Sequence, residues 1–266
     1  MTTYQLASLA DIAIEASKIA GDAILEHYKS DIGVDMKKDG SPITLADTSS
    51  NQSIIESLAK TNLPIVSEET IELPFESTYY WLVDPLDGTK DFIAANDEFT
   101  INIALIENDR PLLGVVFAPA LNELYVGFKG KEAWAEIDGQ IRTAMPLKKS
   151  ERLVMATSRF HDHPDANAFA IENNIDCFKA LGSSLKYGRL ILGEIDVYPR
   201  LVGTSEWDTA AGQAIVEAGG GQMLDWHTGN PLCYNKPNRR NGRFIAIRSP
   251  YQFSDFKFQR YNIELL

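Results

Sequence analysis

The sequence predicts an α+β or α/β sandwich in which helices and mixed β-sheets alternate as layers. Between residues 6 and 24, alanine, leucine and isoleucine recur at steps of three and four, which is typical of an amphipathic helix. Between residues 99 and 144, apolar runs follow one another at hairpin spacing, which indicates an antiparallel meander. After residue 152, short apolar runs alternate with helical segments, as in a layered α/β domain.

In the first half of the chain, residues 34–38 are expected to form a short strand. Thr44 is expected to cap a second helix and to place Asp47 in its first turn. Further strands are predicted where apolar runs occur, at residues 64–66, 81–83, 99–105, 112–117, 123–128, 131–137 and 141–144. Polar and apolar residues alternate in 99–105, so we expect that strand to be half-buried. Asp138-Gly139 is a strong signal for a two-residue hairpin between the last two of these strands.

In the second half, short apolar runs predict strands at residues 153–156, 177–180, 195–198, 222–224 and 244–247. Helical patterns between them predict helices at residues 165–173, 184–192 and 208–217. The segment 250–266 receives no assignment. Pro146 and the charged run 148–152 mark a predicted boundary between an N-terminal α+β domain, residues 1–147, and a C-terminal α/β domain, residues 148–266.

Composition excludes several classes of protein. The chain has 266 residues and a net charge of −12, which argues against a nucleic-acid-binding face or attachment to an anionic membrane. Two cysteines, Cys177 and Cys233, are too few for a disulfide framework or a zinc site. No apolar run approaches the ~18 residues of a membrane span, and no signal peptide is evident, so we expect a cytoplasmic protein.

The stretch from Trp81 to Ile93 organises the candidate chemistry. An apolar run leads into Asp84, a second carboxylate follows at Asp87, and Gly88-Thr89 turns the chain. We expect Pro85 and Gly88 to stop the strand, so that both carboxylates lie at its end. Crowded carboxylates repel one another unless cations lie between them, and hard divalent ions prefer oxygen ligands. A plain acidic turn is the alternative; the spacing fits neither an EF-hand loop nor an aspartyl-phosphate motif.

Two further acidic motifs have ordinary interpretations when taken alone. Glu68 and Glu69 follow a predicted strand and would suit a solvated loop. Asp208 begins a predicted helix and would suit an N-cap, and Asp47 would suit a first helical turn.

Taken together, three motifs resemble the magnesium-dependent, lithium-sensitive phosphatases of the inositol monophosphatase family. They are Ser67-Glu68-Glu69, Asp84-Pro85-Leu86-Asp87-Gly88-Thr89, and Trp207-Asp208-x-x-Ala211-Gly212 followed by Glu217-Ala218-Gly219-Gly220. The resemblance runs from Gly21 to about Asp225 and implies the layered sugar-phosphatase fold.

Within that family, five other segments are most similar to the 3′(2′),5′-bisphosphate nucleotidases: residues 40–47, 90–92, 98–105, 182–186 and 198–200. The resemblance therefore implies a phosphomonoesterase of sulfur metabolism that hydrolyses 3′-phosphoadenosine 5′-phosphate to AMP and phosphate. Its substrate would be a small phosphorylated molecule and not a nucleic acid polymer. The oligomeric state stays open, as does a peripheral membrane association.

The resemblance also implies the site residues. Two or three Mg²⁺ would be bound by four carboxylates and one backbone carbonyl: Glu68, Asp84, Asp87, Asp208 and Leu86. Thr89 and Asp47 would form the general base, with Glu69 as an auxiliary. Substrate contacts would come from Gly88, Thr89, Gly182, Ser183, Lys186 and Asp208.

Several residues near these motifs have other expected roles. Arg159, Arg189 and Arg200 are weaker candidates for substrate contact, and a surface cation is the alternative for each. We expect Trp207 to pack in the core. His161 and His163 are expected to lie in a loop and not to bind a metal. Glu206 receives no role.

Two other functions are alternatives. One is an inositol monophosphatase or broader sugar phosphatase, although Lys90-Asp91-Phe92 replaces the Thr-Asn-Phe of typical inositol enzymes. The other is a non-catalytic metal-binding regulatory module. The regulatory module is disfavoured because Asp47 and Thr89, the pair expected to activate water, are both present.

Overall fold

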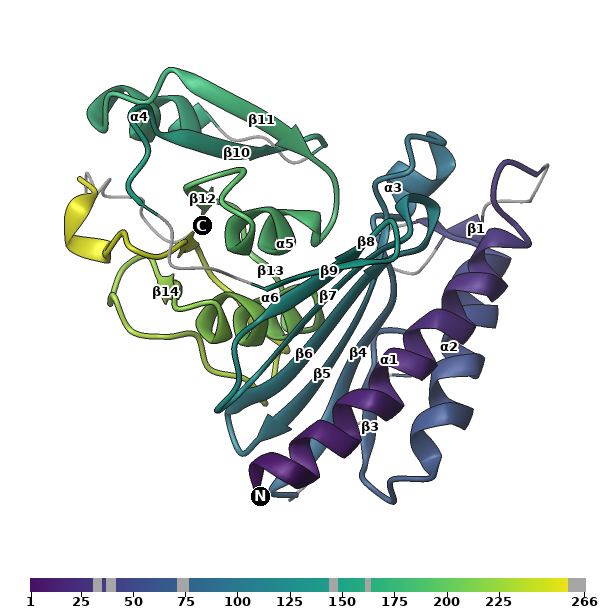
Figure 1. The fold of residues 1–266 in the computed structure, drawn as a ribbon. Helices are drawn as coiled ribbons and strands as arrows, with labels where there is room; N and C mark the ends of the chain where they lie inside the picture. The colour runs from purple at the N-terminus through teal and green to yellow at the C-terminus, as the bar shows by residue number, and fades with distance from the viewer. Residues whose placement is uncertain (31–34, 37–41, 71–76, 144–147, 161–163, 258–266) are drawn as a thin grey trace.

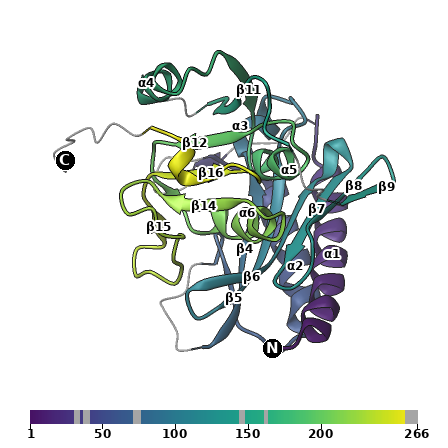
Figure 2. The same cartoon turned by 60° about the vertical axis from the view of Figure 1, so that its left-hand side comes forward.

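The computed structural model describes residues 1–30, 35–36, 42–70, 77–143, 148–160 and 164–257. Helices and sheets alternate in layers, as predicted (Figure 1). Helices α1 (Thr3–Leu25) and α2 (Leu45–Ala59) cover one face of a seven-stranded sheet. Helices α5 (Leu185–Ile191) and α6 (Trp207–Ala218) lie on its other face, between it and a five-stranded sheet (Figure 2). Helix α4 (Pro164–Glu172) packs on the far side of that second sheet.

The two predicted N-terminal helices are confirmed. Helix α1 presents small buried residues such as Ala13 and Ala16 to the sheet, which allows close packing. Helix α2 begins with the predicted cap: Ala46 N donates to Thr44 Oγ1 at 3.2 Å. Thr44 N and its hydroxyl both donate to Asp47 Oδ2 at 2.7 Å, which completes a capping box.

The seven-stranded sheet follows the order of the sequence. Its strands are β3 (Ile65–Ser67), β4 (Tyr79–Asp87), β5 (Thr100–Glu107), β6 (Arg110–Ala118), β7 (Glu123–Phe128), β8 (Trp134–Ile137) and β9 (Gln140–Thr143). Strand β3 is parallel to β4, and every later pair is antiparallel. Asp138 and Gly139 both have positive φ, as the predicted hairpin turn requires.

Two predictions for this sheet were wrong in part. Strand β4 ends just before Gly88, as predicted, but Pro85 does not stop it. The strand continues to Asp87 because the register shifts between Asp84, opposite Asn102, and Asp87, opposite Thr100. Such an irregularity accommodates a proline inside a strand. Strand β5 is buried and not half-buried, since helices cover both faces of the sheet; its polar Thr100 and Asn102 are therefore enclosed.

The second sheet is mixed, as predicted. Its order is β11 (Cys177–Leu181), β10 (Val154–Ser158), β12 (Val197–Arg200), β16 (Phe244–Ile247) and β14 (Gln222–Asp225). Strand β10 is parallel to both neighbours, and β16 is antiparallel to both of its own.

Strand β1 (Asp35–Met36) lies within the strand expected at residues 34–38 and pairs with β2 (Pro42–Ile43), which was not expected. The other short elements were not predicted. These are α3 (Thr89–Ile93), η1 (Pro119–Leu121), η2 (Phe253–Asp255), and the ribbon of β13 (Thr204–Ser205) with β15 (Arg240–Asn241). The short helix η2 lies in the unassigned C-terminal segment, whose residues 258–266 are outside the described part of the chain.

Helix α6 lies directly on strand β6. A Cβ atom on Gly114 would come within 2.1 Å of the Ala211 carbonyl oxygen, so only glycine allows this approach. One core cluster includes residues of both halves of the chain, such as Tyr80 and Phe244. The division at residue 147 remains a prediction. Among the described helices, none is both long and apolar enough to cross a membrane.

Candidate active site

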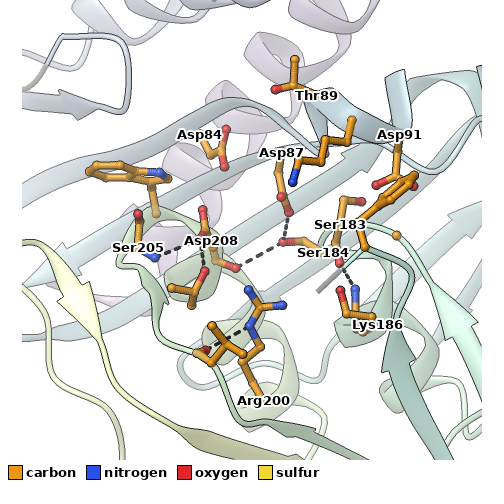
Figure 3. A pocket seen from close by; sticks show the side chains of 18 of the residues that line it. Asp84, Asp87, Thr89, Asp91, Ser183, Ser184, Lys186, Arg200, Ser205 and Asp208 are labelled. Atoms are coloured by element: carbon orange, nitrogen blue, oxygen red, sulfur yellow. Dashed lines mark hydrogen bonds between the residues drawn. The ribbon is translucent and has the colours of Figure 1, made fainter. Parts of the chain in front are cut away.

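An open cavity of about 540 Å³ lies where the end of β4, helix α3, the turn before α5 and the start of α6 meet (Figure 3). Most of the predicted site residues line it: Glu68, Asp84, Leu86, Asp87, Gly88, Thr89, Gly182, Ser183, Lys186 and Asp208. Residues more than one hundred positions apart in the sequence thus share one pocket.

Three of the predicted carboxylates converge closely. One carboxylate oxygen each of Glu68, Asp84 and Asp208 lies within 4.8 Å of the other two. Parallel pairing of β3 with β4 brings two of them together, because Glu68 N donates to Val83 O at 3.1 Å, beside Asp84. The third comes from the first turn of α6. Three hard oxygen donors at this spacing can hold a divalent cation.

The fourth carboxylate, Asp87, is held by hydroxyl and amide donors. Its Oδ2 accepts hydrogen bonds from Ser184 Oγ at 2.7 Å, Asn102 Nδ2 at 3.3 Å and Thr100 Oγ1 at 3.4 Å. Ser184 Oγ also lies 3.2 Å from the backbone oxygen of Asp208, so it connects two of the acidic residues (Figure 3). The buried polar side chains of β5 therefore help to orient a carboxylate of the site.

Asp208 is surrounded by its own donors and by an unfavourable charge. Its Oδ2 accepts from Ser205 N at 2.9 Å and from the hydroxyl of Thr204. Burial, and then the charge of Asp87, raise the pKa of Asp208 above its ordinary value. A cation between these carboxylates would relieve both effects, so the donor set fits a divalent metal.

The predicted water-activating pair is adjacent to this acidic cluster. Gly88, at φ 89°, turns the chain from β4 into α3 and exposes Thr89 to the cavity. Thr89 Oγ1 lies 3.4 Å from Asp47 Oδ1 and 3.5 Å from the Leu86 carbonyl oxygen. Asp47 is buried behind Thr89. Glu69 is not among the described residues that line the cavity.

A second wall of the cavity carries positive charge. Lys186 is buried, donates to the Ser183 carbonyl oxygen at 2.6 Å and lies over the ring of Tyr198. Burial lowers the pKa of Lys186 to about 8. Ser183 has φ 39°, and its buried Oγ has no hydrogen-bond partner among the described residues. Arg200 lines the same wall (Figure 3).

The three weaker arginine candidates differ in position. Arg159 and Arg200 line the cavity. Arg189 lies away from it and pairs with Glu123 at 2.6 Å and Glu194 at 3.2 Å, so the interpretation as a structural cation holds.

The neighbours of Asp208 have structural roles. Trp207 belongs to the core, as predicted, although it also borders the cavity. Glu206 is fully buried and accepts from the backbone N–H groups of Asn235 and Lys236 at 3.0 Å. It therefore holds the 235–239 loop. His161 and His163 lie outside the described residues.

Sequence reasoning missed several residues of the site. Ser184, Thr204 and Ser205 position carboxylates, and Phe160 is a large aromatic residue that lines the cavity while remaining 43% exposed. The alternating polar residues of β5 were a usable signal, because a polar side chain enclosed by helices needs a partner. Nothing local distinguished the others.

Comparisons with known proteins agree with this geometry. The model of the inositol monophosphatase family matches residues 5–246. The 3′(2′),5′-bisphosphate nucleotidase CysQ of Escherichia coli K12 is 38% identical over 231 residues, covering 84% of this chain and 93% of its own. The CysQ of Buchnera aphidicola is 39% identical over 238 residues, covering 86% and 88%.

Solved structures agree with the sequence comparisons. The crystal structure of CysQ from Bacteroides thetaiotaomicron, a bacterial member of the inositol monophosphatase family, is 34% identical, with a TM-score of 0.81 over 92% of this chain and 98% of its own. The Thermotoga maritima inositol monophosphatase TM1415 is 26% identical, with a TM-score of 0.73 over 89% and 91%. The chain belongs to the inositol monophosphatase family and is a phosphatase.

Proposed function

We propose that this phosphatase is a Mg²⁺-dependent 3′(2′),5′-bisphosphate nucleotidase that hydrolyses 3′-phosphoadenosine 5′-phosphate to AMP and phosphate. The observation that supports this most is that one cavity is lined by two kinds of charge. Carboxylates form what we call its acidic wall, and Lys186 and Arg200 form its basic wall. A substrate with two phosphates can use both walls, whereas a monophosphate uses one. The CysQ relatives bear the name of this activity.

The acidic wall would hold two or three Mg²⁺ through carboxylate oxygens of Glu68, Asp84, Asp87 and Asp208 and the carbonyl of Leu86. Oxygen donors are what Mg²⁺ prefers. When bound, Mg²⁺ supplies charge stabilisation at the phosphoryl group and makes water a stronger acid. The resemblance to the family supports this metal and also the expected inhibition by lithium.

The protein's own part in the reaction is to take up a proton and to orient the ester. Thr89 Oγ1 would accept a hydrogen bond from the attacking water while its own hydrogen points to Asp47 Oδ1, 3.4 Å away. Asp47 is fixed for this by its bonds from Thr44. We assign Glu69 no more than an auxiliary role. The N–H groups of Gly88 and Thr89 would bind the phosphoryl oxygens at the glycine turn.

The basic wall would bind the phosphate that is not cleaved. Lys186 Nζ, the guanidinium of Arg200 and the unpaired Oγ of Ser183 offer a charged donor set of the kind that phosphate needs. Gly182 brings this turn close to the cavity. Asp208 would contact the ribose side of the substrate. Phe160 offers an apolar face for the base.

A substrate panel tests this function. We expect purified protein with Mg²⁺ to hydrolyse 3′-phosphoadenosine 5′-phosphate with a higher kcat/KM than inositol 1-phosphate or fructose 1,6-bisphosphate, and EDTA to abolish the reaction. A preference for either sugar ester would refute the proposal in favour of a sugar phosphatase. A place in sulfur metabolism and a cytoplasmic location follow from the same resemblance.

A further inference from the structure

We infer that Glu98 is a positioning residue for the subsite of the retained phosphate and acts through the peptide N–H of Gly182. This inference rests on the proposed function, because it concerns the phosphate that is not cleaved. Glu98 precedes β5, and the turn that it holds lies 84 residues further along the chain. The side chain of Glu98 is 19% exposed.

The carboxylate of Glu98 connects three separate segments. Its Oε2 accepts from Gly182 N at 2.7 Å and from Arg159 Nη2 at 2.7 Å. The backbone N of Glu98 donates to Asn96 Oδ1 at 3.0 Å, and Asn96 Nδ2 donates to Asp91 Oδ1 at 2.6 Å. The loop after α3, the end of β10 and the turn before α5 are thereby joined through one side chain.

The turn that Glu98 holds has little freedom. A Cβ atom on Gly182 would lie 2.6 Å from Asp91 Oδ1 and 2.7 Å from the Glu98 carbonyl oxygen, so no larger residue fits. The next residue, Ser183, has φ 39°, in a region where a side chain is strained. Strained backbone persists only when its surroundings hold it, and the charge-assisted bond from Gly182 N supplies such a restraint.

The conformation of this turn places the two groups that would bind the retained phosphate. Lys186 Nζ is fixed by its 2.6 Å bond to the Ser183 carbonyl oxygen. The Oγ of the same serine is buried without a hydrogen-bond partner among the described residues, and Ser183 lines the cavity. A shift of the Gly182 peptide would therefore move both donors.

A carboxylate beside a phosphate subsite would repel the ligand unless its charge were balanced. Arg159 provides that balance, since its guanidinium bonds to Glu98 and lies 3.7 Å from Asp91 Oδ1. Arg159 also lines the cavity. The three side chains together leave one negative charge, and the charges of Asp91 and Glu98 raise the pKa of Lys186 against the effect of its burial.

The test compares two esters that differ in the retained phosphate, 3′-phosphoadenosine 5′-phosphate and adenosine 3′-monophosphate. Glu98→Ala should raise KM for the bisphosphate about tenfold, because the Gly182 peptide loses a hydrogen bond to a charged group and water replaces that bond only in part. kcat for both esters, and KM for the monophosphate, should change less than about twofold. Glu98→Gln should restore most of the affinity, since its amide oxygen can accept the Gly182 N–H.

Glu136→Ala is the matched control, because Glu136 forms an ion pair with Lys18 at 3.3 Å and does not line the cavity. An equal rise in KM for both esters, or a Glu98→Gln variant as weak as Glu98→Ala, overturns the inference. If Glu98→Ala does not fold, Glu98→Asp can replace it. This substitution shortens the side chain by one methylene, which moves the acceptor away from Gly182 N, and it should show the same selective rise in KM for the bisphosphate. Failure of the proposed function is distinguishable, because the wild-type protein itself would then not favour the bisphosphate.

Discussion

The acidic and basic walls of the cavity respond to burial in opposite directions. On the acidic wall, burial and the charge of Asp87 raise the pKa of Asp208. On the basic wall, burial lowers the pKa of Lys186, although Asp87 and Asp91 oppose that effect. Each wall therefore holds a charge whose burial is unfavourable, and the opposite charges within the cavity offset that cost only in part. The comparison indicates a site organised for ligands that bring the missing charges.

The walls also differ in how they are held. Hydroxyl and backbone donors fix the carboxylates of Asp87 and Asp208. Lys186 is fixed by one carbonyl oxygen and an aromatic ring, on a turn that depends on Glu98. Damage to the acidic wall should therefore reduce turnover, and damage to the basic wall should reduce affinity.

The largest expected effect comes from Asp87→Asn. We expect kcat for 3′-phosphoadenosine 5′-phosphate to fall on the order of 1,000-fold in saturating Mg²⁺, because losing a proposed metal ligand would remove about several kcal/mol of charge stabilisation. The metal-free variant should be as stable as the wild type or more stable, since the repulsion with Asp208 is relieved. Steady-state kinetics and thermal melting in EDTA measure the two effects. An unfolded variant would show instead that Asp87 is structural.

The second effect is on the basic wall. Lys186→Met should raise KM for the bisphosphate roughly 30-fold and leave kcat within about threefold, because it removes a charged donor and keeps much of the apolar stem. Lys179→Met is the control, since Lys179 pairs with Glu194 and does not line the cavity. A fall in kcat with unchanged KM would place Lys186 in the chemical step. It would contradict the expectation that the acidic wall determines turnover and the basic wall determines affinity.

The same lysine gives a pH dependence. With its pKa lowered to about 8, Lys186 loses its charge as pH rises through 8, so KM for the bisphosphate should rise between pH 7 and 9. Adenosine 3′-monophosphate and the Lys186→Met variant should lack this rise. Between pH 8 and the ordinary value of 10.5, the unfolded chain binds more protons at this group, so its contribution to the unfolding free energy increases with pH. A pH-independent KM would contradict the assignment.

The carboxylates of the acidic wall were predicted from the family resemblance, because each of them has an ordinary interpretation when taken alone. An apolar run ending in Asp84 and a helix beginning at Asp208 mark the ends of a strand and a helix, but do not by themselves indicate a ligand. The layers and most elements followed from periodicity. The bulge that extends β4 through Pro85 could not be predicted, since it depends on the register with β5. Ser184 and Glu98 act on partners 97 and 84 residues away, and no periodicity encodes such contacts.

The smallest expected effect concerns the base of the substrate. Phe160 belongs to none of the core clusters of the described residues, yet it lines the cavity on the side of Arg159. Stacking of a base on an aromatic ring contributes about 1–3 kcal/mol, and an exposed ring lies at the low end. Phe160→Ala should therefore raise KM for 3′-phosphoadenosine 5′-phosphate about fivefold, and Phe160→Tyr should not. Hydrolysis of ribose 3,5-bisphosphate, which lacks the base, should be unchanged in both variants. An equal rise in KM for the base-free ester would mean that Phe160 shapes the phosphate-binding part of the cavity and does not recognise the base. Phe160 would then belong to the basic wall.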